Sequence, residues 1–268
     1  MPAFLQAAVL GIVQGVTEFL PISSTAHLLI AERLLGFQDQ GGVFTVMIQL
    51  GSIFAVVWLF RAKVLATLTG LPANPQARRF ALMLAVAVVP ALVAGAALSG
   101  FVTRVLYNAL AVNGVTFIVG GIVILFVERS RPAVTVHDVD STPVSKAFGI
   151  GVCQAVAIIP GTSRSGATIV GGMLLGLDRA VATEFSFFLA MPTLAAAFAN
   201  SLWRVRHDIT TGQSTTIAIG FVTAFISSAV VIKPFLNYVR RSGFQPFAWY
   251  RIVAGIGLLA ALWSGWRP

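Results

Sequence analysis

Long apolar stretches separated by short polar segments dominate this sequence of 268 residues. Six of the stretches are about as long as a helix that crosses a lipid bilayer, and they lie near residues 43–60, 80–99, 105–127, 185–202, 215–236 and 247–266. Because a backbone inside lipid has to satisfy its own hydrogen bonds, each stretch predicts a membrane-spanning α-helix. The pattern therefore predicts an all-α polytopic membrane protein, with residues 1–268 forming a single membrane domain.

Two further stretches, residues 2–36 and 144–177, are apolar at both ends but interrupted in the middle by Pro, Gly, Ser and Thr. Each half of such a stretch is too short to cross a bilayer comfortably. Irregular backbone is tolerated at membrane depth only where protein or a water-filled cavity surrounds it. Both stretches therefore predict a re-entrant helix-loop-helix hairpin.

The two interrupted stretches resemble each other at an offset of 140 residues. The matching positions are Gly11 and Gly151, Gln14 and Gln154, Val16 and Val156, and the Leu-Leu-Gly segments 34–36 and 174–176. The chain is thus predicted to be an internal duplication, with repeats over about 1–128 and 144–268. Because each repeat combines one re-entrant hairpin with three transmembrane helices, an odd number, the second repeat is predicted to have inverted topology.

Composition and charge agree with a membrane location. Hydrophobic residues make up 57% of the chain and charged residues 10%, which excludes an ordinary soluble domain. The formal net charge of +9 would suit nucleic acid, but the basic residues are scattered over short loops, where they set topology and contact anionic lipids. We therefore expect membrane lipids, and no nucleic acid, as partners. The single cysteine, Cys153, excludes an intramolecular disulfide.

Lysines and arginines are unequally divided between the two sides of this predicted topology. Twelve of them, including Arg251, fall on one side, and five fall on the other. The more basic side is expected to face the cytoplasm. Both termini and the open end of the first hairpin then face outward, whereas the second hairpin enters from the cytoplasm.

The first interruption carries oxygen ligands. Gln14 and Glu18 are four residues apart and so share one helix face. Carboxylate and amide oxygens are suitable partners for a hard divalent cation. The pair therefore predicts a site for Mg²⁺ or Ca²⁺.

Hydroxyl groups and an imidazole follow the same interruption. Ser23, Ser24 and Thr25 stand at the expected start of the next helix, and His27 lies about one turn further on. Hydroxyls at this position often do no more than cap free backbone N–H groups. A hydroxyl near an imidazole is also the pair needed for a nucleophile with a general base. We expect His27 to contact Ser24 and to accept its proton or that of a water that Ser24 positions.

The second interruption, residues 160–168, has the composition of an anion site. A turn at Pro160–Gly161 leads into Thr162, Ser163 and Ser165, which offer hydroxyl and N–H donors at a helix N-terminus. Arg164 adds a planar fork of donors that suits phosphate. The alternative is an ordinary loop rich in Gly and Ser. Glu184, at the start of a later span, either supports Arg164 or lies at the membrane interface.

Together these motifs strongly resemble the bacterial undecaprenyl pyrophosphate phosphatase family, the BacA or UppP type linked to bacitracin resistance. The resemblance runs in order across nearly the whole chain and rests on Gln14-x-x-x-Glu18, Pro21-Ile-Ser-Ser-Thr-Ala-His27, the segment 160–168 and Glu184-Phe-Ser-Phe. It implies a bacterial inner-membrane enzyme that removes the terminal phosphate of undecaprenyl pyrophosphate, which recycles the lipid carrier for cell-wall synthesis. It also implies dependence on a divalent cation, re-entrant inverted repeats and an active site open to the periplasmic, outer face.

The resemblance also assigns roles to individual residues. The implied catalytic residues are Glu18, Ser24, His27 and Arg164. The substrate-binding residues expected beside them are Ser23, Thr25, Ser163, Ser165 and Thr168, to which the turn adds Gly161 and Thr162. Position 14 is often Glu in the family, and Gln14 keeps an oxygen ligand but removes a charge. Because Glu18 and Arg164 are charges inside the membrane, each is expected to contact substrate or metal rather than another side chain.

A lipid-phosphate translocase is the alternative from another functional class, because inverted repeats with broken helices are also a transporter architecture. Phosphate release by the purified protein in detergent, where no transport occurs, separates the two. The sequence leaves open whether Ser24 attacks directly or orients a metal-bound water. It also leaves open the preferred cation, the chain-length selectivity and whether the protein is a homo-oligomer.

Overall fold

The computed structural model of the chain describes residues 1–39, 42–102, 109–130, 133–205 and 214–266. Within these ranges the chain is helical, and the only β pairing described is an isolated bridge between Val136 and Leu177. The predicted all-α class is therefore confirmed.

Within the described residues, five helices are long and apolar enough to cross a membrane: α5 (Pro75–Phe101), α6 (Leu110–Ser130), α9 (Arg179–Val205), α10 (Ser214–Ser242) and α11 (Gln245–Trp263). A sixth span results if α3 (Val43–Leu59) is joined with α4 (Arg61–Gly70), from which it is bent by 78°. The chain is thus a multi-pass membrane protein, and the predicted spans correspond to these helices. α4 was not predicted, because its basic residues fall after the apolar stretch has ended at Phe60.

Two pairs of shorter helices form the predicted hairpins. The first pair is α1 (Ala3–Thr17) and α2 (Ser24–Leu35). The second is α7 (Val144–Ala155), extended by the short 3-10 helix η4 (Val156–Ile158), and α8 (Arg164–Leu174). At about 1.5 Å per residue, none of these helices reaches across the roughly 30 Å of a bilayer core. Both interrupted stretches are therefore helix-break-helix units, as expected.

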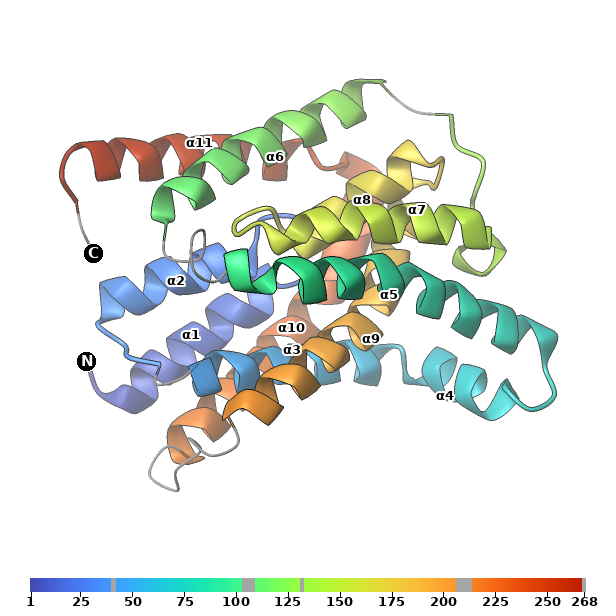
Figure 1. Cartoon of the computed structure of the whole chain (residues 1–268), viewed down its shortest axis with the longest axis horizontal. Coiled ribbons are helices and arrows are strands. Elements are labelled where there is room, and N and C mark those ends of the chain that lie inside the picture. Colours follow the sequence, from blue (N-terminus) through green and yellow to red (C-terminus); the bar gives the residue numbers. More distant parts are fainter. Residues whose placement is uncertain (40–41, 103–108, 131–132, 206–213, 267–268) are drawn as a thin grey trace.

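The breaks of the two hairpins lie in the interior, and their open ends lie at opposite ends of the molecule (Figure 1). α1 and α2 both reach the left end of the view, where the two chain termini also lie, whereas α7 begins and α8 ends toward the right. This is the arrangement expected of hairpins that enter a membrane from opposite sides.

Each hairpin packs against a spanning helix from the other half of the chain. α1 lies along α10 and α7 lies along α5, while α6 pairs with α11. A Cβ on Gly11 would lie 2.4 Å from the carbonyl oxygen of Gly220 on α10, and one on Gly151 would lie 2.2 Å from that of Ala87 on α5. These two corresponding glycines therefore permit the close helix contacts. The reciprocal pattern agrees with a duplication, and the inverted relation between the halves stays a prediction.

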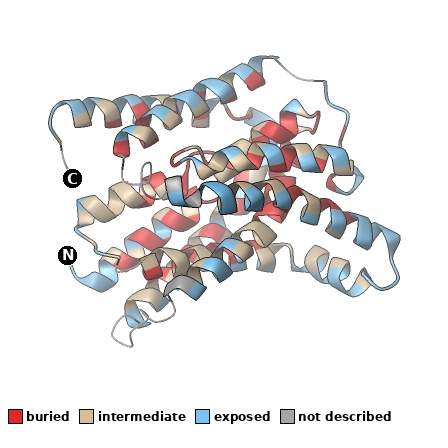
Figure 2. Cartoon of the chain, viewed as in Figure 1, coloured by how far each residue is buried: buried red, intermediate tan, exposed pale blue. Residues whose placement is uncertain are grey.

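Buried side chains gather where the hairpin breaks meet the spanning helices (Figure 2). Phe19, in the first break, packs edge to face against Phe187 of α9, with ring centroids 5.3 Å apart. Phe188 of α9 packs in the same way on Phe80 of α5, at 5.1 Å. The outer faces of the spanning helices expose apolar side chains such as Val253, as expected of a surface in contact with lipid.

Arg251 departs from the predicted charge distribution. Its assignment to the cytoplasmic surface is wrong, because the side chain is completely buried in α11. Burial is possible because its guanidinium donates hydrogen bonds to backbone carbonyl groups. Other arginines used in the same comparison lie outside the described residues, namely Arg104, Arg131, Arg206 and Arg267, together with the side chain of Arg204.

Candidate active site

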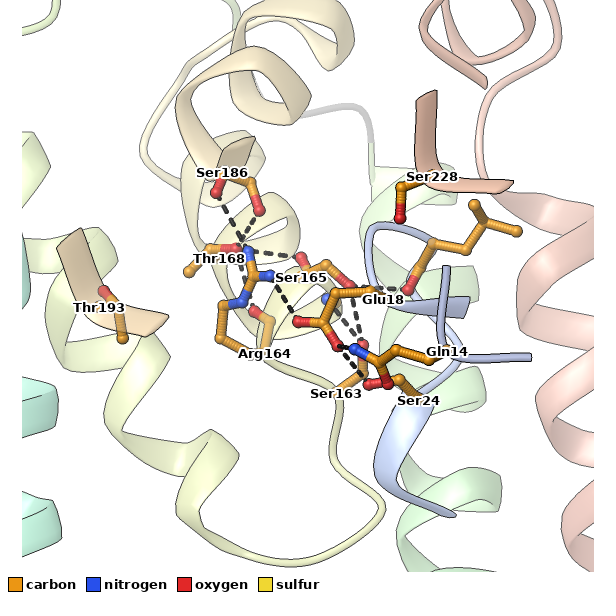
Figure 3. A network of polar contacts seen from close by, with 12 residues as sticks. Gln14, Glu18, Ser24, Ser163, Arg164, Ser165, Thr168, Ser186, Thr193 and Ser228 are labelled. Atoms are coloured by element: carbon orange, nitrogen blue, oxygen red, sulfur yellow. Dashed lines mark hydrogen bonds and ion pairs between the residues drawn. The ribbon is translucent and has the colours of Figure 1, made fainter. Parts of the chain in front are cut away.

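The two hairpin breaks meet and form one polar cluster (Figure 3). The first break, residues 18–23, joins α1 to α2, and the second, residues 159–163, joins η4 to α8. Ser165 Oγ, in the first turn of α8, donates a hydrogen bond of 2.7 Å to the carbonyl oxygen of Leu20. Two motifs that are far apart in the sequence therefore share one site.

The carboxylate of Glu18 is the centre of this cluster. Its Oε2 accepts hydrogen bonds from Ser24 Oγ at 2.5 Å and from Gln14 Nε2 at 3.0 Å. Its Oε1 forms an ion pair with Nη2 of Arg164 at 2.9 Å, and both side chains are largely buried. Glu18 and Arg164 are thus each other's partner, which corrects the expectation that neither charge would meet another side chain.

The residues just before α2 and α8 have an unusual backbone conformation. Ser23 and Ser163 have φ angles of 69° and 75°, and they are the non-glycine residues with positive φ in the described part of the chain. Such a conformation costs about 1–3 kcal/mol and persists only where the surroundings hold it. Ser163 Oγ accepts a hydrogen bond from Gly166 N at 3.1 Å and so caps α8, whereas Ser23 makes no side-chain cap. The backbone therefore enters α2 and α8 in a similar conformation.

A cavity of about 330 Å³ opens between the two breaks. The predicted site residues that line it are Glu18, Ser23, Ser24, Thr25, Gly161, Ser163 and Arg164. Apolar side chains, among them Ile158 and Leu194, form part of the wall, and Gln49 adds an amide group. The cavity therefore joins a polar floor made by both hairpins to an apolar wall.

Among the hydrogen bonds of the described residues none joins His27 to Ser24, which corrects the predicted serine–histidine pair. Its Nδ1 lies 2.7 Å from the carbonyl oxygen of Ser23, and its Nε2 lies 2.6 Å from the hydroxyl of Tyr250 on α11. The imidazole is stacked on the Tyr250 ring, with centroids 5.7 Å apart, and it also contacts Phe117. Ser24 instead donates to Glu18, so the carboxylate is the base within direct reach of this hydroxyl.

Three other predicted residues, Thr162, Ser165 and Thr168, contact residues around the site without lining the cavity. Thr168 Oγ1 lies 2.6 Å from Ser186 Oγ on α9, and Ser165 Oγ lies 3.0 Å from Ser163 Oγ. The carbonyl oxygen of Thr162 accepts a hydrogen bond from Arg251. These contacts hold the second break and α8 in place.

Glu184 lies away from these residues. It lines a separate cavity of about 750 Å³, together with Asp138, Arg179 and Arg240, which contains no residue of either break. Arg164 bonds to Glu18 and to the carbonyl oxygen of Ser186, at 3.2 Å. The alternative in which Glu184 supports Arg164 is therefore not seen.

Two buried polar atoms at the site have no hydrogen-bond partner among the described residues: Arg164 Nε and Gln14 Oε1. Leaving a buried polar atom unpaired costs about 1–3 kcal/mol, so such atoms are often found where a ligand supplies the missing partner. Arg164 Nε is a donor and suits an anion. Gln14 Oε1 is an acceptor of the kind that a hard cation takes, although the same amide directs its Nε2 toward Glu18 Oε2.

Three contributors to the site were missed by the sequence analysis: Tyr250, Arg251 and Ser186. Ser186 lies within the Glu184-Phe-Ser-Phe motif, but a single Ser in an apolar helix gives little signal. Tyr250 resembles an ordinary aromatic anchor at the membrane surface. Arg251 did carry a signal, since an arginine well inside an apolar helix is normally functional.

Comparison with known proteins identifies the family of the chain. Residues 7–257 match the model of the family described as bacitracin resistance protein BacA. An undecaprenyl-diphosphatase of Cereibacter sphaeroides is 45% identical over 97% of each chain. Undecaprenyl-diphosphatase 1 of Agrobacterium fabrum is 46% identical over 98% of each chain, and undecaprenyl-diphosphatase 2 of Rhodospirillum rubrum is 46% identical over 97% of this chain and 96% of its own. The chain therefore belongs to the BacA family.

Proposed function

We propose that the chain is an integral membrane phosphatase that hydrolyses undecaprenyl pyrophosphate to undecaprenyl phosphate and inorganic phosphate, thereby recycling the cell-wall lipid carrier. The proposal is supported by near full-length relatives that are named undecaprenyl-diphosphatases. The same relatives give no support to the translocase alternative.

The observation that carries the proposal is the contact of the Glu18 carboxylate with both Ser24 and Arg164. Hydrolysis of a phosphoanhydride requires a positioned nucleophile, a group that takes its proton, and positive charge around the transferred phosphoryl group. Ser24, Glu18 and Arg164 supply these in turn. The unpaired Arg164 Nε and the N-termini of α2 and α8 add donors for the phosphate oxygens.

The contacts support a sequence of proton and bond changes in which Ser24 is the nucleophile. Ser24 Oγ attacks the terminal phosphorus, its proton passes to Glu18 Oε2, and the phosphoanhydride bond breaks so that undecaprenyl phosphate leaves with the electron pair. Glu18 returns the proton to the leaving phosphate. In the second step Glu18 takes a proton from water, which attacks the phosphoserine, and the proton goes to Ser24 Oγ as inorganic phosphate departs.

Gln14 and Glu18 are proposed to hold the divalent cation, Mg²⁺ or Ca²⁺, that the family resemblance implies. The support is chemical: an unpaired amide oxygen lies beside a carboxylate in a buried site. When bound, the cation would neutralise charge on the pyrophosphate. His27, held by Tyr250 at the edge of the site, is proposed to assist proton exchange with solvent.

The proposed location is the bacterial inner membrane, with the active site open to the periplasmic face. The first hairpin, which contributes Glu18 and Ser24, has its open end beside both termini. The excess of basic residues on the opposite side supports an outward position for that end. The isoprenoid chain of the substrate would then remain in lipid along the apolar wall of the cavity.

Phosphate release from undecaprenyl pyrophosphate by the purified protein in detergent tests the function. We expect the native protein to release phosphate, and Glu18→Gln and Arg164→Ala to lose about 100-fold or more of kcat. The first removes the group that takes the proton of Ser24, and the second removes positive charge at the reacting phosphate. Arg164→Lys should also be impaired, since an ammonium lacks the planar fork. Arg61→Ala, at an exposed arginine of α4, is the matched control. Near-normal turnover in Glu18→Gln or Arg164→Ala would refute their roles.

A further inference from the structure

Arg251 is a fully buried arginine that no carboxylate accompanies. No acidic side chain in the described part of the chain forms an ion pair with it. Its guanidinium instead donates five hydrogen bonds, all to backbone carbonyl oxygens. The acceptors are Thr116 at 2.8 Å, Thr162 at 3.0 Å, Pro21 and Gly161 at 3.1 Å each, and Phe117 at 3.3 Å.

These carbonyls come from three segments that meet at the active site. Pro21 belongs to the first break, between Glu18 and Ser24, and Gly161 and Thr162 belong to the second break, directly before Ser163. The remaining two acceptors lie on α6. Irregular backbone at membrane depth has carbonyl groups that need protein partners. One side chain from α11 therefore supplies partners to both breaks at once.

The space around the guanidinium is shaped for it. A Cβ on Gly120 of α6 would lie 2.2 Å from Arg251 Nη2, so only glycine leaves room at this position. The ring of Phe117 lies 5.4 Å from Arg251 Cζ and covers the group. The five N–H donors of arginine match the number of acceptors, whereas a lysine has three. Both the shape of the site and its hydrogen bonds therefore specify arginine.

The position of these bonds along the chain matters for catalysis. Because a peptide unit is planar, holding the Thr162 carbonyl also fixes the peptide plane that enters Ser163. Ser163 has the strained φ of 75° from which α8 and Arg164 begin. On the other side, the Pro21 carbonyl is three residues before Ser24 and three after Glu18.

We propose that Arg251 is a positioning residue for the phosphatase reaction: it fixes the two hairpin breaks relative to each other, so that Glu18 and Ser24 of one face Arg164 of the other. The inference rests on the proposed function for its kinetic consequence. Its structural consequence, the fixed relation of the two hairpins, is independent of the substrate.

The five hydrogen bonds from Arg251 to the two breaks and α6 form a clamp, and two variants disturb it from different helices. Arg251→Lys keeps the charge but loses donors, and Gly120→Ala keeps the arginine but crowds its site. Gly257→Ala is the matched control, because a Cβ there meets nothing within 4 Å on the same helix as Arg251. We measure kcat and KM for phosphate release from undecaprenyl pyrophosphate in detergent, together with the melting temperature of each variant.

We expect kcat to fall by about 100-fold in both variants, because misplaced catalytic groups lose rate rather than ground-state binding, while KM stays within about threefold. The control should match the native protein. Unchanged kcat in both variants, or a loss confined to KM, would overturn the proposal. If Arg251→Lys does not yield folded protein, Gly120→Ala alone decides between these outcomes.

A second measurement needs no substrate. Spin labels are attached at Leu34 and Leu174, which are exposed on α2 and α8, in a Cys153→Ala background. The distance distribution between the labels should be narrow in the native protein and in Gly257→Ala, and broader in Arg251→Lys and Gly120→Ala. An equally narrow distribution in all four would overturn the clamp. If the native protein releases no phosphate but the distributions differ as expected, the proposed function fails and the clamp stands.

Discussion

Glu18 divides its two carboxylate oxygens between partners of different chemistry. One oxygen faces the Ser24 hydroxyl and the Gln14 amide, and the other faces the Arg164 guanidinium. The same carboxylate can therefore take a proton from the nucleophile while its charge keeps the arginine in place. Several functions then depend on one residue, and substitutions of its neighbours should not act independently.

Ser24 and Glu18 are expected to act as a unit. Because the hydroxyl donates directly to the carboxylate, Ser24→Ala, Glu18→Gln and the double variant should retain similar residual kcat, each reduced by about 100- to 10,000-fold. Ser264→Ala, at an exposed serine, serves as the control. Multiplicative losses in the double variant would argue for separate roles. If Ser24→Ala kept most of its activity, water rather than the serine would be the nucleophile.

Gln14 offers a test of the cation site. Gln14→Leu removes the unpaired amide oxygen while nearly preserving the volume of the side chain. It should therefore weaken binding of the cation without leaving a cavity in the core. We expect the Mg²⁺ concentration that gives half-maximal activity after treatment with EDTA to rise about tenfold, as for loss of one ligand or its support. Binding of Mn²⁺, followed by electron paramagnetic resonance, should weaken in parallel. Equal metal dependence in the variant and the native protein would remove Gln14 from the site.

At this scale the types of the site residues were predictable and their pairings were not. Charges and hydroxyls inside apolar sequence identified Glu18, Ser24 and Arg164. Whether a side chain points to one neighbour or another depends on helices elsewhere in the chain. His27 turns away from Ser24 because Tyr250, on α11, offers its hydroxyl and its ring. No local spacing contains that information.

Among the elements, the hairpin helices α1 and α7 are short and depend on their neighbours for position. Each approaches a spanning helix so closely that glycine is required at the contact, Gly11 against α10 and Gly151 against α5. The apolar lengths predicted the spans and both hairpins. They did not predict α4, whose sequence is too polar for a span, nor the extra turns by which α9 and α10 extend beyond their apolar centres.

Gly11→Ala and Gly151→Ala should each destabilise the protein by about 1–3 kcal/mol, the usual cost of forcing a methyl group into a packed contact. The added Cβ atoms would lie within 2.4 Å of backbone oxygens, which cannot move as the end of a side chain can. Gly95→Ala on α5 is the matched control, because its Cβ would meet nothing within 4 Å. Thermal unfolding in detergent gives the comparison. Melting temperatures equal to that of the control would contradict the close contact.

For the molecule as a whole, both termini lie at the end where the first hairpin opens, and α4 lies at the other end (Figure 1). The uneven distribution of basic residues indicated that these two ends lie on opposite sides of the membrane. Arg251 should not be included in that comparison, because it is buried. The contacts between the halves could not be predicted, because they join residues that are far apart in the sequence, such as Glu18 and Arg164 or Gly15 and Ser228.

Cysteine labelling tests the orientation in the membrane. In a Cys153→Ala background, an impermeant thiol reagent applied to intact cells should modify Ser264→Cys near the C-terminus but not Ala73→Cys after α4, because the positive-inside rule places residue 73 in the cytoplasm. Both positions are exposed. Permeabilised cells provide the control, in which both cysteines should react. Labelling of residue 73 alone in intact cells would reverse the orientation.

The pairing of Glu18 with Arg164 also has a consequence for biosynthesis. The two residues are 146 positions apart, so at about 5–20 residues per second the ribosome adds Arg164 roughly 7 to 30 s after Glu18. α10, against which α1 packs, is made later still. Until then the first hairpin offers Glu18 only the Gln14 amide and the Ser24 hydroxyl, and the carboxylate lacks its arginine. Catalytic activity then arises only in completed chains.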